Sequence, residues 1–586
     1  MNARSPRSPV TRAPSPTVVR DDADHLEIIT GVLVIGGGPA ATWAALNAAR
    51  TSAGEGLGVT LVDKGYCGAS GVAATSGVGH WLTPPGSPLR DETFRIKNAT
   101  GGGQSDRVWV DAVLDETWAQ ISTLPAMGWD RVDRNRRQPS LDLTTDNPSG
   151  APYFRGPAPD YLRFLRGQVK KAGVTVLDHS PAVELLVTDN RDAVVGARGL
   201  QVRAGRNWTV HAHAVVLATG GTTWRSHSLG GDTNTGDGQL MAAEAGADLA
   251  AMEYSNFQGM VPFGTSMDKN GYFIKAEYWT GDGTPIHYDD LHYSRVPLLE
   301  HSVKGTVYAR FSQFAPAQRA TARENMPNFF AVVDKLGINP FTERFPIDWV
   351  HEGTVRGTGG VRVDDTTCAV GLPGLYAAGD VAARDRITGA ATGAGGPNLS
   401  WAVASGSWAG THAARFAASQ SGSPLTGRPG TASSASSPRG IRRHATGLGS
   451  IATTSFGHGD GRTPDWRELT GRIRAQMLPL TNAVFRSEDR LASMLGELDS
   501  VWDLLRDASP RSPVDEYRLR EVAGMAAMGR WATLSALERR ESRAMHFRVD
   551  HPQTDPEATY RLLVSGVHRP RVHRQPSGKT GVGVPA

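Results

Sequence analysis

The feature that most constrains this chain is a turn of glycines between an apolar run and an Ala-rich run. The segment TGVLVIGGGPAATWAALNAAR, residues 30–50, predicts a buried strand, a tight turn and a helix. Gly36, Gly38 and Ala41 form the pattern G-x-G-x-x-A. The first glycine permits the turn, the second admits a pyrophosphate, and the small third residue lets the helix pack on the strand. Asp63 ends the next apolar run, where a carboxylate can accept hydrogen bonds from a ribose. This order predicts a dinucleotide-binding α/β domain.

Later segments decide between a nicotinamide and a flavin dinucleotide. The loop KGYCGASGVAATSGV after Asp63 consists mostly of small residues, and ATGG at 218–221 ends an apolar strand. A further strand, in GLPGLYAAGD, ends at Gly379 and Asp380. A nicotinamide site needs only the first glycine turn, whereas a flavin also needs loops along its ribityl chain and ring. These segments therefore predict FAD.

Together these segments resemble the flavoprotein subunits of fumarate reductase and succinate dehydrogenase. L-aspartate oxidase and the flavin subunit of adenylylsulfate reductase belong to the same superfamily. The resemblance rests on VLVIGGGPAA, DKGYCGASGVAATSGV, VVLATGG, NTGDGQLMAAEAGA, GLPGLYAAGD and RRESRAMHFRVDHP. It implies an α/β fold with a Rossmann-like FAD-binding domain, an inserted α+β capping domain and a C-terminal helical domain. It also implies an FAD-dependent oxidoreductase in which flavin N5 exchanges hydride with a substrate carbon beneath the cap.

Composition and the resemblance divide the chain into segments. The Ser-, Pro- and Arg-rich start is expected to be a disordered tail outside the fold, and a Ser/Gly/Pro-rich stretch predicts a flexible linker. The predicted divisions are a tail at 1–27, an FAD-binding domain at 28–255 and 350–418, a capping domain at 256–349, a linker at 419–462, a helical domain at 463–552 and a C-terminal extension at 553–586.

The predicted helical domain carries two recognisable patterns. Apolar residues at helical spacing are expected to form bundle core; they are Leu491, Leu495, Leu498, Trp502 and Leu505, with a second set at Leu519, Val522, Ala526 and Trp531. The end of the domain resembles the family's helical-domain signature and is expected to form ion pairs against the FAD domain; its residues are Arg540, Glu541, Arg543, His546 and Arg548.

The cofactor residues follow from the glycine turn, the small-residue loops and the resemblance. They are Gly36, Gly38, Pro39, Ala40, Ala41, Asp63, Lys64, Ser70, Gly71, Ala73, Val183, Ala218, Thr219, Gly220, Asp237, Gly379, Asp380, Asn398 and Leu399. In family members of membrane complexes, a His in S-H-T-V-A-A-Q-G-G attaches FAD covalently. Ser70 stands at that position here, so we expect FAD to be bound without a covalent bond.

The substrate side departs from the family. Gln258 and Val355 stand where the resemblance implies substrate-binding histidines, and Gly393 stands where it implies an arginine that clamps a carboxylate. No clear counterpart of the family's capping-domain Arg acid is found. Because a buried carboxylate needs a cationic partner, fumarate, succinate and aspartate are not the expected substrates. The replacement candidates for the catalytic site are Arg356, His351, Arg386 and Gln258, with Glu352 just upstream of Arg356.

Composition restricts the partners. Only Cys67 and Cys368 occur, so the chain alone cannot hold an iron–sulfur cluster on four thiolates, and Cys67 is expected to be a small packed residue. An iron–sulfur or ferredoxin-like electron partner, adenylylsulfate-reductase-like, stays open as the alternative function, as does a non-catalytic FAD-binding protein. We expect a small-molecule substrate, no nucleic acid, no membrane insertion and a cytoplasmic protein. The basic end RPRVHRQPSGK is expected to be a solvated disordered segment.

Overall fold

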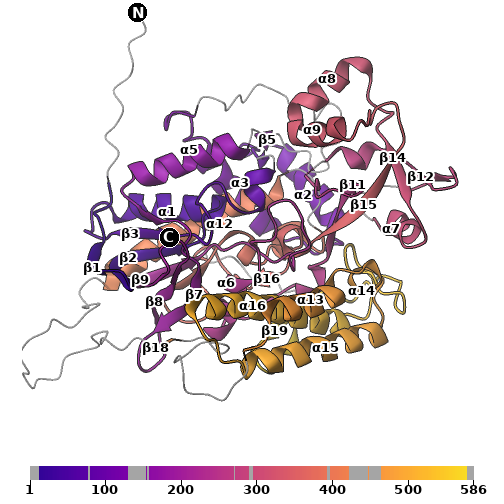
Figure 1. Cartoon of the computed structure of the whole chain (residues 1–586). Coiled ribbons are helices and arrows are strands. Elements are labelled where there is room, and N and C mark those ends of the chain that lie inside the picture. The colour runs from indigo at the N-terminus through magenta and orange to yellow at the C-terminus, as the bar shows by residue number, and fades with distance from the viewer. Residues whose placement is uncertain are drawn as a thin grey trace, which may run out of the picture.

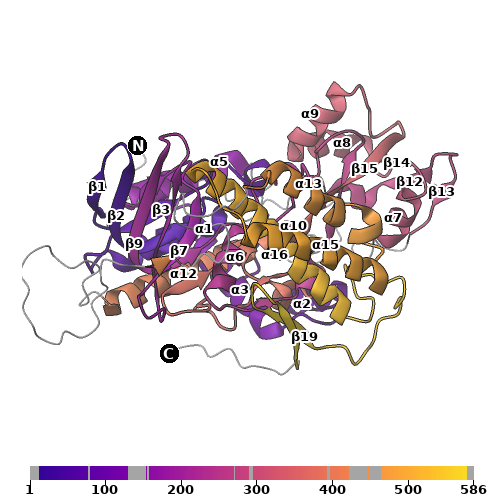
Figure 2. The same ribbon diagram turned by 60° about the horizontal axis from the view of Figure 1, so that its bottom comes forward.

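A computed structural model describes residues 12–76, 79–129, 153–154, 158–269, 271–288, 295–391, 396–420, 446–447 and 463–576. Figures 1 and 2 show three bodies: a sheet with flanking helices, a smaller lobe at one end, and a group of helices along one side. No helix among the described residues is long and apolar enough to cross a bilayer.

The largest sheet has nine strands in the order β18-β7-β8-β9-β2-β3-β6, with β1 paired to β2 and β17 paired to β9. The pairs β2–β3, β2–β9, β3–β6 and β9–β17 are parallel, and β7, β8 and β9 form an antiparallel meander. The strands are β1 (Thr17–Asp21), β2 (His25–Ile35), β3 (Val59–Val62), β6 (Thr175–Leu177), β7 (Ala182–Val187), β8 (Val194–Gln201), β9 (Arg206–Leu217), β17 (Leu375–Ala377) and β18 (Thr446–Gly447).

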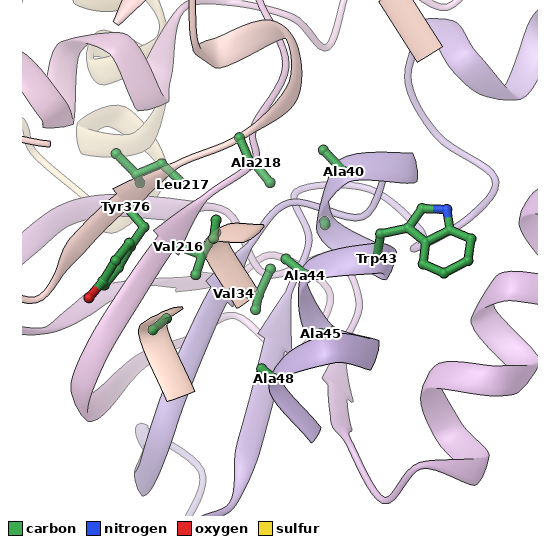
Figure 3. Close-up of a cluster of buried hydrophobic side chains, with 14 of the residues drawn as sticks. Val34, Ala40, Trp43, Ala44, Ala45, Ala48, Val216, Leu217, Ala218 and Tyr376 are labelled. Carbon is green, nitrogen blue, oxygen red and sulfur yellow. The ribbon is translucent and has the colours of Figure 1, made fainter. Parts of the chain in front are cut away.

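Helix α1 (Pro39–Ser52) and helix α12 (Pro397–Gln420) pack against each other, and both contact this sheet. Figure 3 shows the small side chains of Ala40, Ala44 and Ala48 beside the strand residues Val34 and Val216. Glycines of α12 allow the two helices to approach closely, because a Cβ at Gly410 would lie 2.1 Å from the Ala44 carbonyl oxygen. Small residues on both helices therefore set the position of α1, and with it the glycine turn at its start.

The remaining helices of this domain are α2 (Leu89–Thr100), α3 (Arg107–Ile121), α5 (Ala158–Lys171), α6 (Asp237–Glu244), α10 (Gly353–Arg356) and α11 (Asp385–Thr388), with short 3-10 turns η1 (Val72–Thr75), η2 (Met252–Tyr254) and η4 (Gly379–Val381). Strands β4 (His80–Trp81) and β5 (Tyr153–Phe154) form a separate two-stranded sheet.

The inserted lobe is a five-stranded antiparallel sheet in the order β11-β15-β14-β12-β13, covered by short helices. Its core is aromatic and includes Phe273, Phe311, Phe329 and Phe345. The chain enters through β11 and leaves through β15, and these two strands pair with each other. Its elements are β11 (Phe257–Pro262), η3 (Tyr272–Lys275), β12 (Glu277–Thr280), β13 (Pro285–Ile286), α7 (Val296–Ser302), β14 (Val307–Arg310), α8 (Pro316–Asn325), α9 (Pro327–Lys335) and β15 (Phe345–Glu352).

The C-terminal helices are α13 (Trp466–Met477), α14 (Leu480–Ala483), α15 (Glu488–Arg506) and α16 (Pro513–Glu538). Most of the apolar residues assigned to bundle core are buried; Leu495 is only half-buried. In both views α16 lies against the FAD-binding domain, and α15 lies on its outer side (Figures 1 and 2).

Both ends of the chain enter the fold further than expected. The expectation that residues 1–27 stay outside is wrong for residues 12–27, because β1 pairs antiparallel with β2. All β1 side chains are exposed, so backbone hydrogen bonds to β2 keep the strand in the sheet. The sequence therefore has no apolar pattern from which this strand could be predicted. Strands β19 (Arg561–Ser565) and β20 (Arg571–Gln575) likewise form a hairpin in a four-stranded sheet with β10 (Leu249–Ala250) and β16 (Gly360–Val361).

The basic end is therefore not a disordered segment up to Gln575. Residues 577–586 lie outside the described part of the chain, as does Gly393. Most of the predicted linker, 419–462, also lies outside it, except the first residues, which complete α12, and β18, which pairs with β7.

Candidate functional site

A cavity of about 360 Å³ lies at the carboxyl ends of the parallel strands β2, β3, β9 and β17. Each strand delivers a residue to it: Ile35, Asp63, Ala218 and Gly379. Ligands of doubly wound α/β sheets bind at this edge, because the loops that follow the strands converge there.

The glycine turn lies on one wall. Gly36 has φ +128°, and a Cβ there would lie 2.1 Å from the Ala218 carbonyl oxygen, so only glycine fits. Gly38 has φ −80°, and a Cβ there would meet no protein atom within 4 Å. Backbone conformation therefore does not require glycine at Gly38. The absence of a side chain leaves the backbone at the start of α1 open to the cavity.

The acid predicted to meet a ribose is fixed by the serine that replaces the family's tethering histidine. Ser70 Oγ donates a hydrogen bond to Asp63 Oδ2 at 2.9 Å, and both residues line the cavity. Burial raises the pKa of Asp63, an effect that the Ser70 hydrogen bond opposes.

The structure brings most of the predicted cofactor residues to one surface. All of them line the cavity except Ala41, which is buried in the core beneath the turn, and Val183. Val183 packs against Leu200 and Tyr517, and its neighbour Ala182 lines the cavity instead.

Lys64 lines the cavity, but its ammonium is engaged by protein oxygens. Nζ lies 2.5 Å from Asp237 Oδ2 and 3.0 Å from Glu521 Oε1. It also donates to the carbonyl of Thr233 at 3.0 Å and to Thr235 Oγ1 at 2.7 Å. Burial opposes the charge on Lys64, but the two carboxylates outweigh burial and raise its pKa. Lys64 thus connects the cavity loop at 233–237 to helix α16. No sequence pattern pointed to Glu521.

We expect Glu521→Gln to weaken FAD binding about 10-fold, because the loop that carries cavity residues Thr233 and Asp237 loses a buried anchor. Glu516→Gln is the matched control: Glu516 pairs with Arg198 at 2.7 Å in the same interface and does not line the cavity. FAD affinity measured by fluorescence titration should fall in the first variant only. Equal affinities in both variants would contradict this role for Glu521.

Another part of the cavity wall is built around a short helix, α10. Arg384 pairs with Asp380 at 2.6 Å and donates to the carbonyls of Thr354 and Val355. Thr354 Oγ1 also accepts from the backbone N–H of Thr222, after β9. These bonds attach α10 to the sheet, so that Arg356 at its end lines the cavity.

Arg356 is a cation without a close anionic partner. Its guanidinium carbon lies 4.4 Å from the centre of the Phe257 ring, and its nearest carboxylate, Glu352, is 3.9 Å away. It makes no hydrogen bond to any residue that the structure describes. An arginine with five unsatisfied N–H donors at a cavity wall can bind an anion.

Beside Arg356 lies a buried cluster of Asp268, Lys269 and Glu352. Lys269 Nζ lies 2.5 Å from Asp268 and 2.8 Å from Glu352, and Lys269 and Glu352 line the cavity. Burial alone would raise the pKa of Glu352, but Lys269 and Arg356 outweigh it and lower that pKa. Burial and then Glu352 raise the pKa of Asp268 to about 7.

The sequence did not identify Asp268, Lys269 or a third cation, Arg295. Arg295 stacks on Phe257 at 4.4 Å, like Arg356, and donates to the carbonyl of Gln258. Burial and then Arg356 lower the pKa of Arg295 to about 10. No residue pattern marked these positions, because strands and loops of the cap bring them together from distant parts of the sequence.

The other catalytic candidates do not line the cavity. Gln258 Nε2 donates to His351 Nδ1 at 2.6 Å, across the paired strands β11 and β15. Burial and then Arg486 lower the pKa of His351 to about 3, so this histidine stays neutral. Arg386 lies elsewhere: it donates to the Asp364 carbonyl and stacks 5.5 Å from Trp109. Gln258 and His351 therefore form a bond at the base of the cap.

The C-terminal signature forms a buried ion network, with Arg539 at its centre. Arg539 pairs with Glu253 and Glu541 at 2.8 Å each, and Arg543 pairs with Glu541 and donates to the Gly102 carbonyl. The ion pairing against the FAD domain that the sequence predicted is found only in part. Arg539, which was not among the predicted residues, makes the ion pair with Glu253 of that domain. Of the predicted residues, Arg543 reaches that domain through its hydrogen bond to the Gly102 carbonyl. The other three members of the signature contribute as follows: His546 contacts Arg486, Arg548 pairs with Asp550, and the exposed Arg540 reaches only Glu488.

Both cysteines are buried and unpaired. Burial raises the pKa of the Cys67 thiol to about 12, so it is not a thiolate at neutral pH. This agrees with a packed residue rather than a redox group.

The cavity fits a flavin dinucleotide. The open surface at Gly38 faces a space where a backbone can meet a pyrophosphate, and a carboxylate lies next to it at Asp63. Thr219 Oγ1 and Asn234 Oδ1 are buried at the wall without a partner among the described residues. Unpaired buried polar atoms facing a cavity are groups that a polar ligand would satisfy.

Comparisons with known proteins agree with this geometry. Residues 31–277 match the family described as FAD binding domain, and residues 476–576 match the fumarate reductase flavoprotein C-terminal family. An uncharacterized FAD-dependent oxidoreductase of Methanocaldococcus jannaschii is 23% identical, covering 92% of this chain and 96% of that protein. The fumarate reductase flavoprotein subunit of Mycobacterium tuberculosis is 26% identical, covering 94% and 96%. Escherichia coli quinol fumarate reductase FrdA superposes with a TM-score of 0.72 at 18% identity, covering 94% and 97%.

Proposed function

The chain belongs to the family of FAD-dependent oxidoreductases that contains the fumarate reductase and succinate dehydrogenase flavoproteins, and from this premise we propose which reaction it performs. It exchanges a hydride between flavin N5 and a carbon of an organic substrate that is not a simple C4 dicarboxylate. Bound FAD supplies the hydride acceptor or donor. The chain's own residues hold the cofactor along the cavity and bind the substrate next to α10.

The observation that carries this proposal is Arg356. It lines the cavity with its N–H donors unsatisfied among the described residues, and it stands one position after Val355, which replaces a family histidine. A guanidinium in that place can hold one anionic group of a substrate and orient it. The clusters on either side of it are internally paired: Asp380 with Arg384, and Lys269 with two carboxylates.

The experiment that tests the proposal is anaerobic reduction of the bound flavin, screened against a panel of organic acids. We expect reduction by an organic anion, and at best slow reactions with fumarate, succinate and L-aspartate. Bleaching of the flavin absorbance is the measurement. Fast fumarate turnover by the wild type would overturn the proposal.

We further expect FAD to leave the protein on acid denaturation. Ser70 cannot form the histidyl bond to the flavin, and no His, Cys or Tyr is among the described residues that line the cavity. The purified protein should be yellow, and trichloroacetic acid should leave the flavin in the supernatant. Flavin that stays with the precipitated polypeptide would contradict a non-covalent site.

A second candidate function is the flavin subunit of an electron-transfer complex. It is favoured by the Mycobacterium tuberculosis relative, which is named a subunit and matches over 94% of this chain. With two buried cysteines, any iron–sulfur cluster would lie on a partner. Steady peroxide release with substrate and no partner favours an independent oxidase. Substrate reduction that stops after one turnover until a ferredoxin is added favours the complex.

A further inference from the structure

We infer that the substrate carries a single anionic group, bound at Arg356, and that Glu352 and Asp268 exclude a second one by neutralising Lys269. This inference rests on the proposed function and names the substrate class of the same site.

The first step is the state of the two cations at the wall. Arg356 and Lys269 both line the cavity. Lys269 lies within 2.8 Å of Asp268 and Glu352, and the ionised Glu352 alone balances its charge. Arg356 is 3.9 Å from its nearest carboxylate and makes no hydrogen bond to the described residues. Only Arg356 of this pair is therefore available to an incoming anion.

The second step is the negative charge beside it. The second oxygen of Glu352, Oε1, is buried and has no hydrogen-bond partner among the described residues. This side chain is 1% exposed, and Lys269 with Arg356 favours its ionised form. Lys269 itself is faced by Glu352 Oε2 at 2.8 Å and by Asp268 Oδ2 at 2.5 Å. A second substrate carboxylate approaching Lys269 would meet these carboxylate oxygens at short range, where like charges repel.

The third step is the rest of the wall. Arg295 does not line the cavity, and its guanidinium is occupied by the Gln258 carbonyl and the Phe257 ring. The cavity lining also includes small and apolar residues, among them Gly71, Val72, Ala73, Met326, Val355 and Leu399. Such a wall accommodates a hydrocarbon body attached to one charged group.

The test compares acids with the same carbon skeleton and one or two carboxylates. Crotonate is paired with fumarate, and butyrate with succinate. Binding to the oxidised holoprotein is measured by perturbation of the flavin absorption spectrum, without turnover. We expect each monocarboxylate to bind at least about 10-fold tighter than its dicarboxylate partner. Arg356→Ala should abolish the binding of both members of each pair.

Glu352→Gln is the decisive variant. It removes the repelling carboxylate charge and one of the two carboxylate partners of Lys269. The preference for the monocarboxylate should fall at least about 10-fold or reverse. Glu277→Gln is the matched control: Glu277 lies in the same cap on β12, pairs with Arg310 at 3.0 Å and does not line the cavity, so it should leave the preference unchanged. If Glu352→Gln does not retain FAD, the ratio of monocarboxylate affinity to dicarboxylate affinity is measured for Asp268→Asn instead.

The two proposals fail differently. Dicarboxylates that bind the wild type as tightly as monocarboxylates, or a ratio unmoved in both Glu352→Gln and Asp268→Asn, would overturn the single-anion site. Monocarboxylates that bind as expected, while no organic acid ever reduces the flavin, would leave this site intact and overturn hydride exchange.

Discussion

A Gly38→Val variant is expected to fold and to lose FAD. A side chain at this position meets no protein atom within 4 Å, and its backbone at φ −80° suits any residue. The fold should therefore tolerate valine, with an apo-protein unfolding free energy within about 1 kcal/mol of the wild type. The same side chain would stand in the cavity where the backbone must approach a pyrophosphate. FAD affinity should fall at least about 10²-fold, equivalent to about 2.7 kcal/mol.

The matched control is Gly54→Val, just beyond the other end of α1. A Cβ there also meets nothing within 4 Å, but Gly54 is exposed and far from the glycine turn along the helix. FAD titration and chemical denaturation of both apo-variants separate loss of binding from loss of fold. A Gly38→Val protein that purifies with a full complement of FAD would show that the phosphates bind elsewhere.

An Arg356→Ala variant should keep its flavin and lose substrate reactivity. Arg356 lines the cavity, and its contacts with the described residues are its stacking on Phe257 and a 3.9 Å ion pair with Glu352. Removing a cation that orients an anionic substrate should slow flavin reduction by at least about 10²-fold, or about 2.7 kcal/mol in transition-state stabilisation. Anaerobic stopped-flow measurement with the substrate found by the screen gives the rate.

Arg386→Ala is the control for this prediction. Arg386 is also an arginine next to the Asp380 loop, but it contacts Asp364 and Trp109 and does not line the cavity. Its rate of flavin reduction should stay within about 3-fold of the wild type, or about 0.6 kcal/mol. Unchanged kinetics in Arg356→Ala would exclude Arg356 from the substrate site.

The role of the cap is less visible in the sequence than the role of the sheet. The loops after β2, β3, β9 and β17 can be placed from sequence because parallel strands end at a common edge, so local patterns translate directly into position. No comparable rule predicts from the sequence which residues of the cap reach the cavity. Lys269 lies 83 positions from Glu352, in the loop that follows β11, and Glu352 ends β15, the strand that pairs with β11.

The sequence by itself was enough to predict the lining of the proposed cofactor site. Gly36, Gly38, Asp63 and the small residues around Gly71 and Gly379 are local requirements of a turn, a strand end and a narrow loop, and they line one cavity. It also identified Ser70 in place of a tethering histidine, because a single motif contains both positions.

Only the tertiary structure decided the proposed substrate site. It separated Arg356, which faces the cavity, from Arg386 and His351, which do not, because side-chain direction depends on how α10 is attached to Thr222 and Arg384. It added β1, whose strand is held by backbone pairing alone, and Glu521, which reaches Lys64 across a domain boundary. Local sequence fixes backbone geometry over a few residues, whereas ion pairs and cavity walls depend on contacts between segments hundreds of residues apart.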